Sequence, residues 1–362
     1  MVTSYDLLRR DEALYEGQEF YACILDEAQA IKNHTTQKYK AVCKVRSRVR
    51  FALTGTPVEN RLGELWSIFS FLMPGYLPPY KNFCARFEKP IVQEEDQTAV
   101  RRLNQLTGPF ILRRMKSDVL KELPPKTENV YRIELEEEQR KLYLAAVVDA
   151  REKLQAAKPE DKMAVFAVLM RLREICCDPR LIADNWEGGS AKLDACMELV
   201  TAAVEGGHRI LLFSQFTSML ELLAKRLDAE GISHFTLQGS TPKPVRAELV
   251  RRFNGGEVSV FLISLRAGGT GLNLTAADIV IHYDPWWNVA AQNQATDRAY
   301  RIGQKNPVQV YKLIAQDTIE EKIVELQQAK QSLADTVTGT ADGAILSMRP
   351  DELLQLLEGS EP

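Results

Sequence analysis

Five short apolar runs alternate with helix-like segments in the second half of the chain. The runs cover residues 209–214, 234–238, 258–264, 278–283 and 308–314. Between the first two, residues 218–231 have apolar positions at helical spacing and end at a glycine. Val245, Leu249 and Phe253 recur every four residues, which places them on one face of a helix. The alternation predicts an α/β fold with a parallel sheet between about residues 191 and 310.

Two further apolar runs lie near the start of the chain. Residues 20–25 end in Asp26 and Glu27, and residues 49–53 end in Thr54 and Gly55. Apart from Arg50, both runs are apolar, which is typical of strands that are buried on both faces.

The segment between residues 58 and 180 has helical spacing instead, broken by prolines. Leu123–Lys126, which contains Pro124 and Pro125, is the expected hinge, because a Pro-Pro pair stays extended. Apolar positions from Ile319 to Val337 predict a final long helix.

Composition excludes several classes of protein. The 362 residues are 45% apolar and 26% charged, which excludes a wholly disordered chain and allows two or three domains. No apolar run is long enough to span a membrane, and the first residues lack a secretory h-region. Six scattered cysteines without a CxxC pair argue against a zinc site or a disulfide framework. We therefore expect a cytoplasmic protein, associated with the nucleoid if it is bacterial.

The net charge of −3 favours no class of partner by itself. Residues 101–132, however, hold eight Lys or Arg against three Asp or Glu. Such a segment either binds phosphates or forms a solvated surface, and its charge alone does not choose between the two.

Asp26 and Glu27 follow a strand, where nucleotide hydrolases place acids. An aspartate there holds Mg²⁺ against the phosphates, and a neighbouring glutamate polarises the attacking water. Two acids at a helix N-terminus, favoured by the helix dipole, are the structural alternative.

A glycine-rich segment follows the predicted strand at 258–264. Residues 264–273 read Ser-Leu-Arg-Ala-Gly-Gly-Thr-Gly-Leu-Asn, and glycines let backbone N–H groups approach an anion closely. A plain strand-to-helix turn is the alternative.

Two arginines stand out in residues 294–304. Arg298 and Arg301 are three positions apart, so on a helix they would share one face. Paired guanidinium groups aimed at a phosphate are what an arginine finger requires.

Taken in order, these segments resemble the Swi/Snf-type ATPases of helicase superfamily two. The matching segments are DEAQ at 26–29, residues 53–77, 110–128, 171–182, 210–216 with 237–242, 266–274 with 284–288, and 294–304. They correspond in order to motifs II and III, the inter-lobe segment, the second helical insertion and motifs IV, V and VI. The resemblance extends from about Val2 to Gly339.

The resemblance implies an α/β protein with two RecA-like lobes, the first incomplete, and helical insertions between them. Residues 1–57 would be the C-terminal part of lobe 1, residues 58–190 the insertions and linker, residues 191–318 lobe 2, and residues 319–362 a helical segment. The implied activity is ATP-dependent translocation along double-stranded DNA that remodels DNA-bound proteins, with ATP and Mg²⁺ as cofactors.

The resemblance also assigns roles to matching residues. Asp26 and Glu27 would serve Mg²⁺ and water activation. Coupling of nucleotide state to DNA grip would fall to Gln29, Thr54, Gly55 and Thr56. Arg298, Arg301 and Gln294 would complete the ATP site, with Gly271 and Asp297 supporting it. Ser214, Gln215, Arg266 and Trp287 would contact DNA, although a core pair of Trp286 and Trp287 is an alternative.

The sequence departs from the family pattern at three places. The family usually has His where Tyr300 stands and Asp-Trp where Trp286-Trp287 stands, and neither change removes a group needed for hydrolysis. The phosphate loop GxxxxGK[ST], which precedes motif II in the family, is absent, and no Gly-Lys dipeptide occurs. We therefore expect a chain cut inside its first lobe and inactive alone.

Two alternatives remain from the sequence. One is a non-catalytic DNA- or protein-binding module, which the missing phosphate loop favours. The other is a strand-separating helicase of the same superfamily, against which the long helical segment at 58–180 argues.

Overall fold

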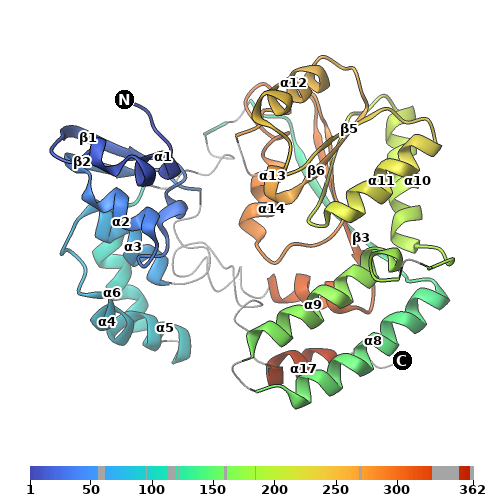
Figure 1. Ribbon diagram of the computed structural model, residues 1–362, viewed down its shortest axis with the longest axis horizontal. Coiled ribbons are helices and arrows are strands. Elements are labelled where there is room, and N and C mark those ends of the chain that lie inside the picture. The colour runs from blue at the N-terminus through green and yellow to red at the C-terminus, as the bar shows by residue number, and fades with distance from the viewer. Residues whose placement is uncertain are drawn as a thin grey trace. The chain divides into compact units, whose positions relative to one another are not determined.

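A computed structural model describes most of the chain, which divides into two compact units (Figure 1). The described residues are 1–55, 62–94, 96–112, 114, 119–120, 122–158, 161–183, 185–268, 271–327 and 350–358. The first unit takes its described residues from 1–114, and the second takes 119–327 and 350–358. Each unit is described by itself.

The first unit is built on two parallel strands, β1 (Glu19–Leu25) and β2 (Arg46–Ala52). Helices α1 (Tyr5–Arg10) and α2 (Gln37–Lys44) and the 3₁₀ turns Glu12–Leu14 and Ala28–Ile31 accompany them. Ser4 and Thr36 cap the two α-helices, each accepting a backbone N–H with its hydroxyl oxygen. Leu25, Ile31, Val42 and Phe71 are central in the core that these elements share.

The expectation that β1 and β2 are buried on both faces is wrong. Tyr21 is 75% exposed, and Ile24 and Phe51, which are register partners, are 61% and 52% exposed. The described elements cover only one face of this sheet. An apolar run predicts a strand, but burial of both faces requires elements on both sides.

Helices complete the first unit. They are α3 (Leu62–Leu72), α4 (Tyr80–Phe83), a π-helical turn (Cys84–Glu88), α5 (Lys89–Gln93), α6 (Gln97–Thr107) and the 3₁₀ turn Gly108–Phe110. Leu65, Phe69, Phe83 and Leu103 pack together among them. The segment at 58–190 is therefore split between the two units. Its helices up to residue 110 pack in the first unit, and its later helices pack in the second.

The second unit contains a six-stranded parallel sheet in the order β3-β8-β7-β4-β6-β5. Its strands are β3 (Lys126–Ile133), β4 (Ile210–Ser214), β5 (His234–Leu237), β6 (Val260–Ser264), β7 (Ile279–His282) and β8 (Val308–Ala315). The predicted α/β fold and all five strands predicted from 209 onward are confirmed. Sheet order reverses at β4, whose neighbours are β6 and β7.

Strand β3 is the part of this sheet that the sequence analysis missed. Helices and a linker were expected here, but Lys126–Ile133 pairs in parallel with all of β8. The Pro125 carbonyl accepts the Val308 N–H at 2.9 Å and so starts the pairing directly after the two prolines. Seven of the eight residues of β3 are exposed, which explains why no apolar run announced the strand.

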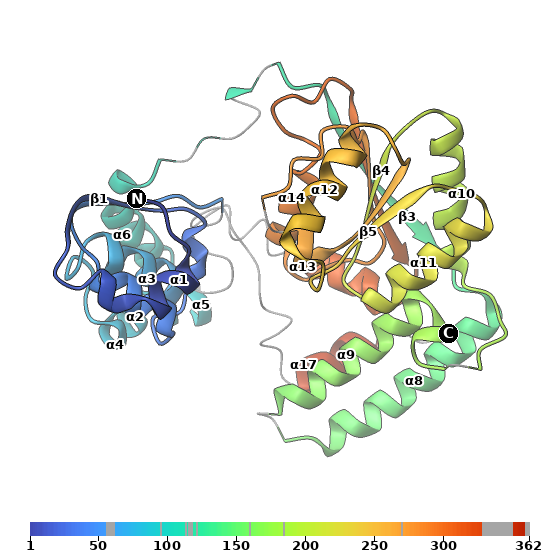
Figure 2. The same cartoon turned by 45° about the horizontal axis from the view of Figure 1, so that its top comes forward.

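Helices cover both faces of the large sheet (Figure 2). Helices α10 (Ala191–Glu205) and α11 (Thr217–Ala229) pack on one face. Helices α12 (Lys243–Asn254), α13 (Leu265–Gly268) and α14 (Val289–Thr296) lie on the other. Ile210 and Leu212 of β4 point to the first core, and Leu211 and Phe213 point to the second.

A helical subassembly adjoins the sheet. It comprises α8 (Glu137–Ala156), α9 (Lys162–Cys177), the 3₁₀ turn Pro179–Leu181, helical residues 319–327 and α17 (Pro350–Glu358). Its core joins Tyr143, Leu172, Ile175 and Ile319 to Trp287. The remainder of the predicted final helix lies outside the described residues. Among the described helices, none has the length and apolar character to cross a membrane.

Candidate functional site

The acidic segment of the first unit lies at the carboxyl end of β1 and is tied to the segment after β2. The Gln29 side chain bridges the two: its Nε2 donates to Glu27 Oε2 at 2.5 Å, and its Oε1 accepts the Thr54 hydroxyl at 2.8 Å. The Ala28 N–H also donates to the Leu53 carbonyl at 2.9 Å. The structure thus joins three predicted site residues. Gly55 is exposed beside them, and Thr56 lies outside the described residues.

Glu27 has a left-handed backbone, with φ of 50° and ψ of 53°. Residues with a Cβ adopt this region at a cost of about 1–2 kcal/mol. Strain of this kind concentrates at functional sites, where the surrounding structure enforces it. The sequence carried no signal of this strain, because Glu is not a residue that favours the left-handed region.

Asp26 is exposed, and its position is set by two hydrogen bonds. Its carbonyl accepts the Tyr5 hydroxyl at 2.7 Å, and its Oδ1 accepts the Glu27 N–H at 3.0 Å. Burial and the nearby Asp26 charge raise the pKa of Tyr5 to about 12, so this phenol stays a donor. Across the described part of the chain, no three His, Cys, Asp or Glu side chains gather closely enough to enclose a metal ion.

The two arginines of the second unit lie beyond a helix, which corrects the expectation that they share a helical face. Helix α14 ends at Thr296, and Asp297 is its C-cap. The Arg298 carbonyl accepts the N–H of Leu274, the residue directly after the glycine-rich segment, at 3.0 Å, so this backbone group does not continue a helix. Arg298 and Arg301 therefore occupy the turn after α14.

Both arginines contact the glycine-rich segment. Arg298 is 7% exposed and donates from Nε to the Gly268 carbonyl at 3.0 Å. Arg301 is exposed, and among the described residues its side chain makes one long hydrogen bond, 3.5 Å, from Nη1 to the Leu272 carbonyl. Gln294 lies on α14, partly exposed, one turn before the arginine segment. Arg301 is thus the arginine with room to meet a ligand.

Gly268 and Gly271 suit their positions in this segment for different structural reasons. A Cβ on Gly268 would lie 2.9 Å from the Phe213 ring, so close packing requires glycine there. Gly271 has a φ of 42°, in the left-handed region. Gly269, Thr270 and the Arg266 side chain lie outside what the structure describes, although the Arg266 backbone belongs to α13.

The predicted DNA contacts Ser214 and Trp287 are buried. Ser214 is 0% exposed and donates to Asp284 Oδ1 at 2.6 Å. Trp287 is 6% exposed and stacks on Trp286 with ring centroids 4.9 Å apart, the core pair weighed as an alternative. Gln215 follows Ser214, and its side-chain Oε1 and Nε2 are buried without a hydrogen-bond partner among the described residues. Contact of these three residues with DNA stays a prediction.

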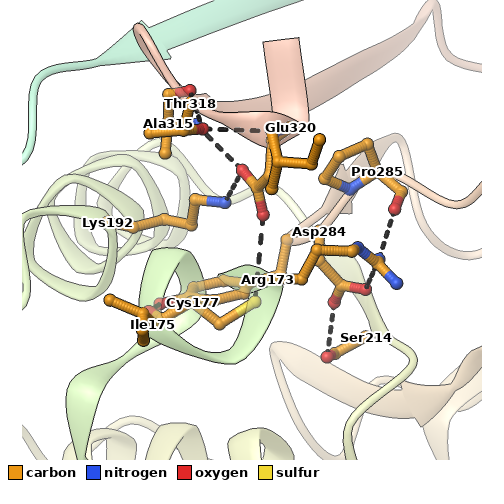
Figure 3. Close-up of polar contacts among 12 residues, drawn as sticks. Arg173, Ile175, Cys177, Lys192, Ser214, Asp284, Pro285, Ala315, Thr318 and Glu320 are labelled. Carbon is orange, nitrogen blue, oxygen red and sulfur yellow. Dashed lines mark hydrogen bonds and ion pairs between the residues drawn. The ribbon is translucent and has the colours of Figure 1, made fainter. Parts of the chain in front are cut away.

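Two buried ion pairs, which the sequence did not predict, lie near the carboxyl ends of strands in the second unit (Figure 3). Arg173 of α9 pairs with Asp284, which follows β7, and Lys192 of α10 pairs with Glu320. All four side chains are fully buried. A signal existed for Arg173, which sits among Leu169, Leu172 and Cys176 in an apolar helix.

Burial shifts the pKa values of these groups. Desolvation raises the pKa of Asp284 above its ordinary value, against the opposing effects of Arg173 and Ser214. Burial acts to lower the pKa of Lys192, but the Glu320 carboxylate raises it above its ordinary value. Glu320 is held in turn by the Ala315 N–H at 2.9 Å.

His282 at the end of β7 is a buried neutral group. Desolvation, followed by the positive charge of Lys312, lowers its pKa to about 3. Its Nε2 lies 2.9 Å from the Thr296 hydroxyl, and its ring stacks on Phe213. It therefore links β7 to the last residue of α14, directly before the arginine segment.

Comparison with known proteins gives matches along nearly the whole chain. The SNF2-related domain matches residues 1–181, and the helicase conserved C-terminal domain matches residues 191–303. An uncharacterised ATP-dependent helicase of Mycoplasma pneumoniae is 40% identical over 99% of this chain and 34% of its own length. The putative ATP-dependent helicase/translocase YwqA of Bacillus subtilis is 40% identical over 98% of this chain and 40% of its own. The chain thus spans about a third to two fifths of the length of these curated relatives.

A solved structure is also similar. The SWI2/SNF2 ATPase core of Sulfolobus solfataricus in complex with double-stranded DNA is 36% identical, with a TM-score of 0.55. The match covers 96% of this chain and 75% of that one.

Proposed function

Because this chain belongs to the SWI2/SNF2 family, we propose that it forms part of an ATP-driven motor that moves along double-stranded DNA and remodels the proteins bound to it. The similarity to a SWI2/SNF2 core in complex with double-stranded DNA, over 96% of this chain, is the observation that carries the proposal. Fold alone would not suffice, since one fold serves many functions.

The acidic segment of the first unit suits the nucleotide chemistry. Asp26 and Glu27 are exposed at a strand end. Mg²⁺ is commonly held by one or two carboxylates together with substrate phosphates and water, so two acids suffice. When bound with ATP, Mg²⁺ neutralises charge on the phosphates. Asp26 would hold it, and Glu27 would orient the attacking water.

The bridge through Gln29 suits a coupling role. Gln29 connects Glu27 to Thr54, so a change at the acidic segment reaches the segment that follows β2. In the second unit, Arg298 and Arg301 would stabilise charge on the transferred phosphoryl group, with Gln294 and Asp297 supporting them. Arg298 would also hold Gly268 in place.

Contacts to DNA would go mainly to phosphates and carry little base specificity. The candidates are the basic segment at 101–132, the residues from 266 to 274, and the turn at 214–216 with the neighbouring Trp287. Fluorescence anisotropy with a short duplex tests this: affinity should fall steeply between low and moderate salt, because phosphate contacts release counterions. A flat salt dependence would contradict it.

ATP hydrolysis by these 362 residues alone should be slow, because the sequence contains no Gly-Lys dipeptide and hence no phosphate loop of the usual kind. Oriented N–H donors and a lysine normally hold the β- and γ-phosphates, and each such charge-assisted bond is worth roughly 1.5–3 kcal/mol. Phosphate release stimulated by duplex DNA measures this, with Asp26→Ala as control. Turnover near ~1 s⁻¹ that the control abolishes would contradict the expectation.

Two assays with different DNA substrates distinguish a translocase on duplex DNA from a strand-separating helicase. A longer form with a phosphate loop should move a triplex-forming strand off duplex DNA in an ATP-dependent way without unwinding a forked duplex. Efficient unwinding of the fork would favour the helicase alternative.

A further inference from the structure

A single buried guanidinium joins the helical subassembly to two turns at the carboxyl edge of the large sheet. Arg173 of α9 is 0% exposed. Its Nη2 donates to Asp284 Oδ2 at 3.3 Å and to the Pro285 carbonyl at 2.5 Å (Figure 3). Its guanidinium also lies over the ring of Trp287, 4.6 Å from the centroid. Arg173 thus contacts three of the four residues from 284 to 287.

Asp284 connects Arg173 to the turn after β4. Its carboxylate accepts the Ser214 hydroxyl at 2.6 Å and the Gln215 N–H at 3.2 and 3.4 Å. Ser214 Oγ accepts the Phe216 N–H at 3.1 Å. The conformation of residues 214–216 is therefore set by a carboxylate that Arg173 holds.

The turn lies where ligands of such sheets bind. Strand β4 is flanked by β6 and β7, so the order of strands reverses at its carboxyl end. In open parallel sheets, ligands bind in the crevice at this reversal. The Gln215 amide, whose Oε1 and Nε2 lack a partner among the described residues, belongs to this turn.

Stability alone does not explain an arginine at this place. Arg173 Nε and Nη1 are buried without a hydrogen-bond partner in the described part of the chain. Buried ion pairs with unsatisfied donors are often replaced by apolar side chains at no cost in stability. A fixed, planar donor is needed instead where two turns must be held in one arrangement.

We propose that Arg173 is a positioning residue for duplex DNA: through Asp284 it holds the turn at 214–216 and the loop at 284–287, in which Gln215 and Trp286 are partly exposed, in the arrangement that lets this edge of the sheet bind the phosphate backbone. This inference rests on the proposed function. Arg173 acts through other residues and does not itself meet DNA, since it is fully buried.

DNA affinity of the 362-residue chain tests the proposal. Arg173→Lys and Asp284→Asn should each weaken binding of a short duplex about tenfold. The slope of log Kd against log salt should not change, because no phosphate contact is removed. A slope reduced by about one would mean that Arg173 contacts a phosphate directly, and would overturn the positioning role.

Two matched controls separate positioning from stability. Arg171→Lys makes the same change at an exposed arginine of α9. Glu320→Gln breaks the other fully buried ion pair, which makes no hydrogen bond to residues 214–216. Both should bind DNA within twofold of the unmodified chain, at a temperature where circular dichroism shows all variants folded. If Glu320→Gln weakens binding as much as Asp284→Asn, the proposal is wrong.

Hydrogen exchange supplies a readout that does not depend on DNA. Arg173→Lys and Asp284→Asn should speed amide exchange of residues 214–217 about tenfold, and Glu320→Gln should leave it unchanged. Unchanged exchange in the first two variants would overturn the inference. If the unmodified chain bound no DNA while exchange responded as expected, the proposed function would fail but the positioning contact would stand.

Discussion

Polar residues follow strands in both units, but they are used differently. In the first unit, Asp26 and Glu27 are exposed, and Glu27 is held in a left-handed conformation. In the second unit, Asp284 after β7 is fully buried and paired with Arg173. The first arrangement leaves both carboxylates exposed to solvent, at a cost in backbone strain at Glu27. The second uses a carboxylate to fix backbone segments. The same residue type after a strand therefore does not imply the same task.

The largest expected effect concerns Arg301, the exposed arginine of the second unit. In a longer form of the protein with a phosphate loop, Arg301→Ala should lower ATP turnover about 10³-fold, the scale of a finger that stabilises transition-state charge. ATP binding should change far less. Steady-state phosphate release measures the effect, with exposed Arg171→Ala as control.

Arg298→Ala should lower turnover on a similar scale and should also destabilise the unit, because its side chain is buried against the Gly268 carbonyl. Near-normal turnover in both variants would refute the arginine assignment.

The same Asp→Asn substitution, made once in each unit, tests whether the two carboxylates differ in their environment. Asp284→Asn should reduce the free energy of unfolding by about 3–5 kcal/mol, because it leaves the buried Arg173 charge unpaired. Asp26→Asn should change it by no more than about 0.5 kcal/mol, since that side chain is exposed. Urea unfolding of the 362-residue chain measures both. Equal effects would show that the two carboxylates are in similar environments.

His282 predicts a pH dependence confined to the second unit. Its folded pKa of about 3 lies below the ordinary 6.5, so only the unfolded state takes up a proton between these values. The contribution of His282 to the free energy of unfolding is complete above pH 6.5. Below that pH it falls by about 1.4 kcal/mol for each pH unit. Urea unfolding at pH 7, 6 and 5 should show this loss, and His282→Gln should lack it. If the free energy of unfolding of His282→Gln fell with pH as steeply as that of the unmodified chain, the pH dependence would come from other groups.

The smallest expected effect tests the strain at Glu27. Glu27→Ala and Glu27→Gly both remove the carboxylate that Gln29 contacts, but only glycine adopts a φ of 50° freely. Glu27→Gly should be more stable than Glu27→Ala by about 1 kcal/mol, as the melting temperatures of the two variants would show. Equal stabilities would mean that the backbone relaxes.

Periodicity predicted the large sheet well because its strands are short, apolar and separated by amphipathic helices. It failed at β3, whose exposed residues give no apolar run. It predicted the strands β1 and β2 correctly, but not that their apolar residues are exposed on one face. The order of motifs identified Gln29 and Thr54 as related residues, and the structure shows the hydrogen bond between them.

The sequence by itself determined the fold class and the family, because spacing and motif order are local properties of the chain. Only the tertiary structure decided which charged groups are exposed and which are buried. Arg173 and Asp284 are 111 positions apart, and Lys192 and Glu320 are 128 apart. Partners at such separations are brought together by the packing of α9 and α10 against strand ends. The environment that sets the pKa of a carboxylate, and hence its task, is made by those distant contacts.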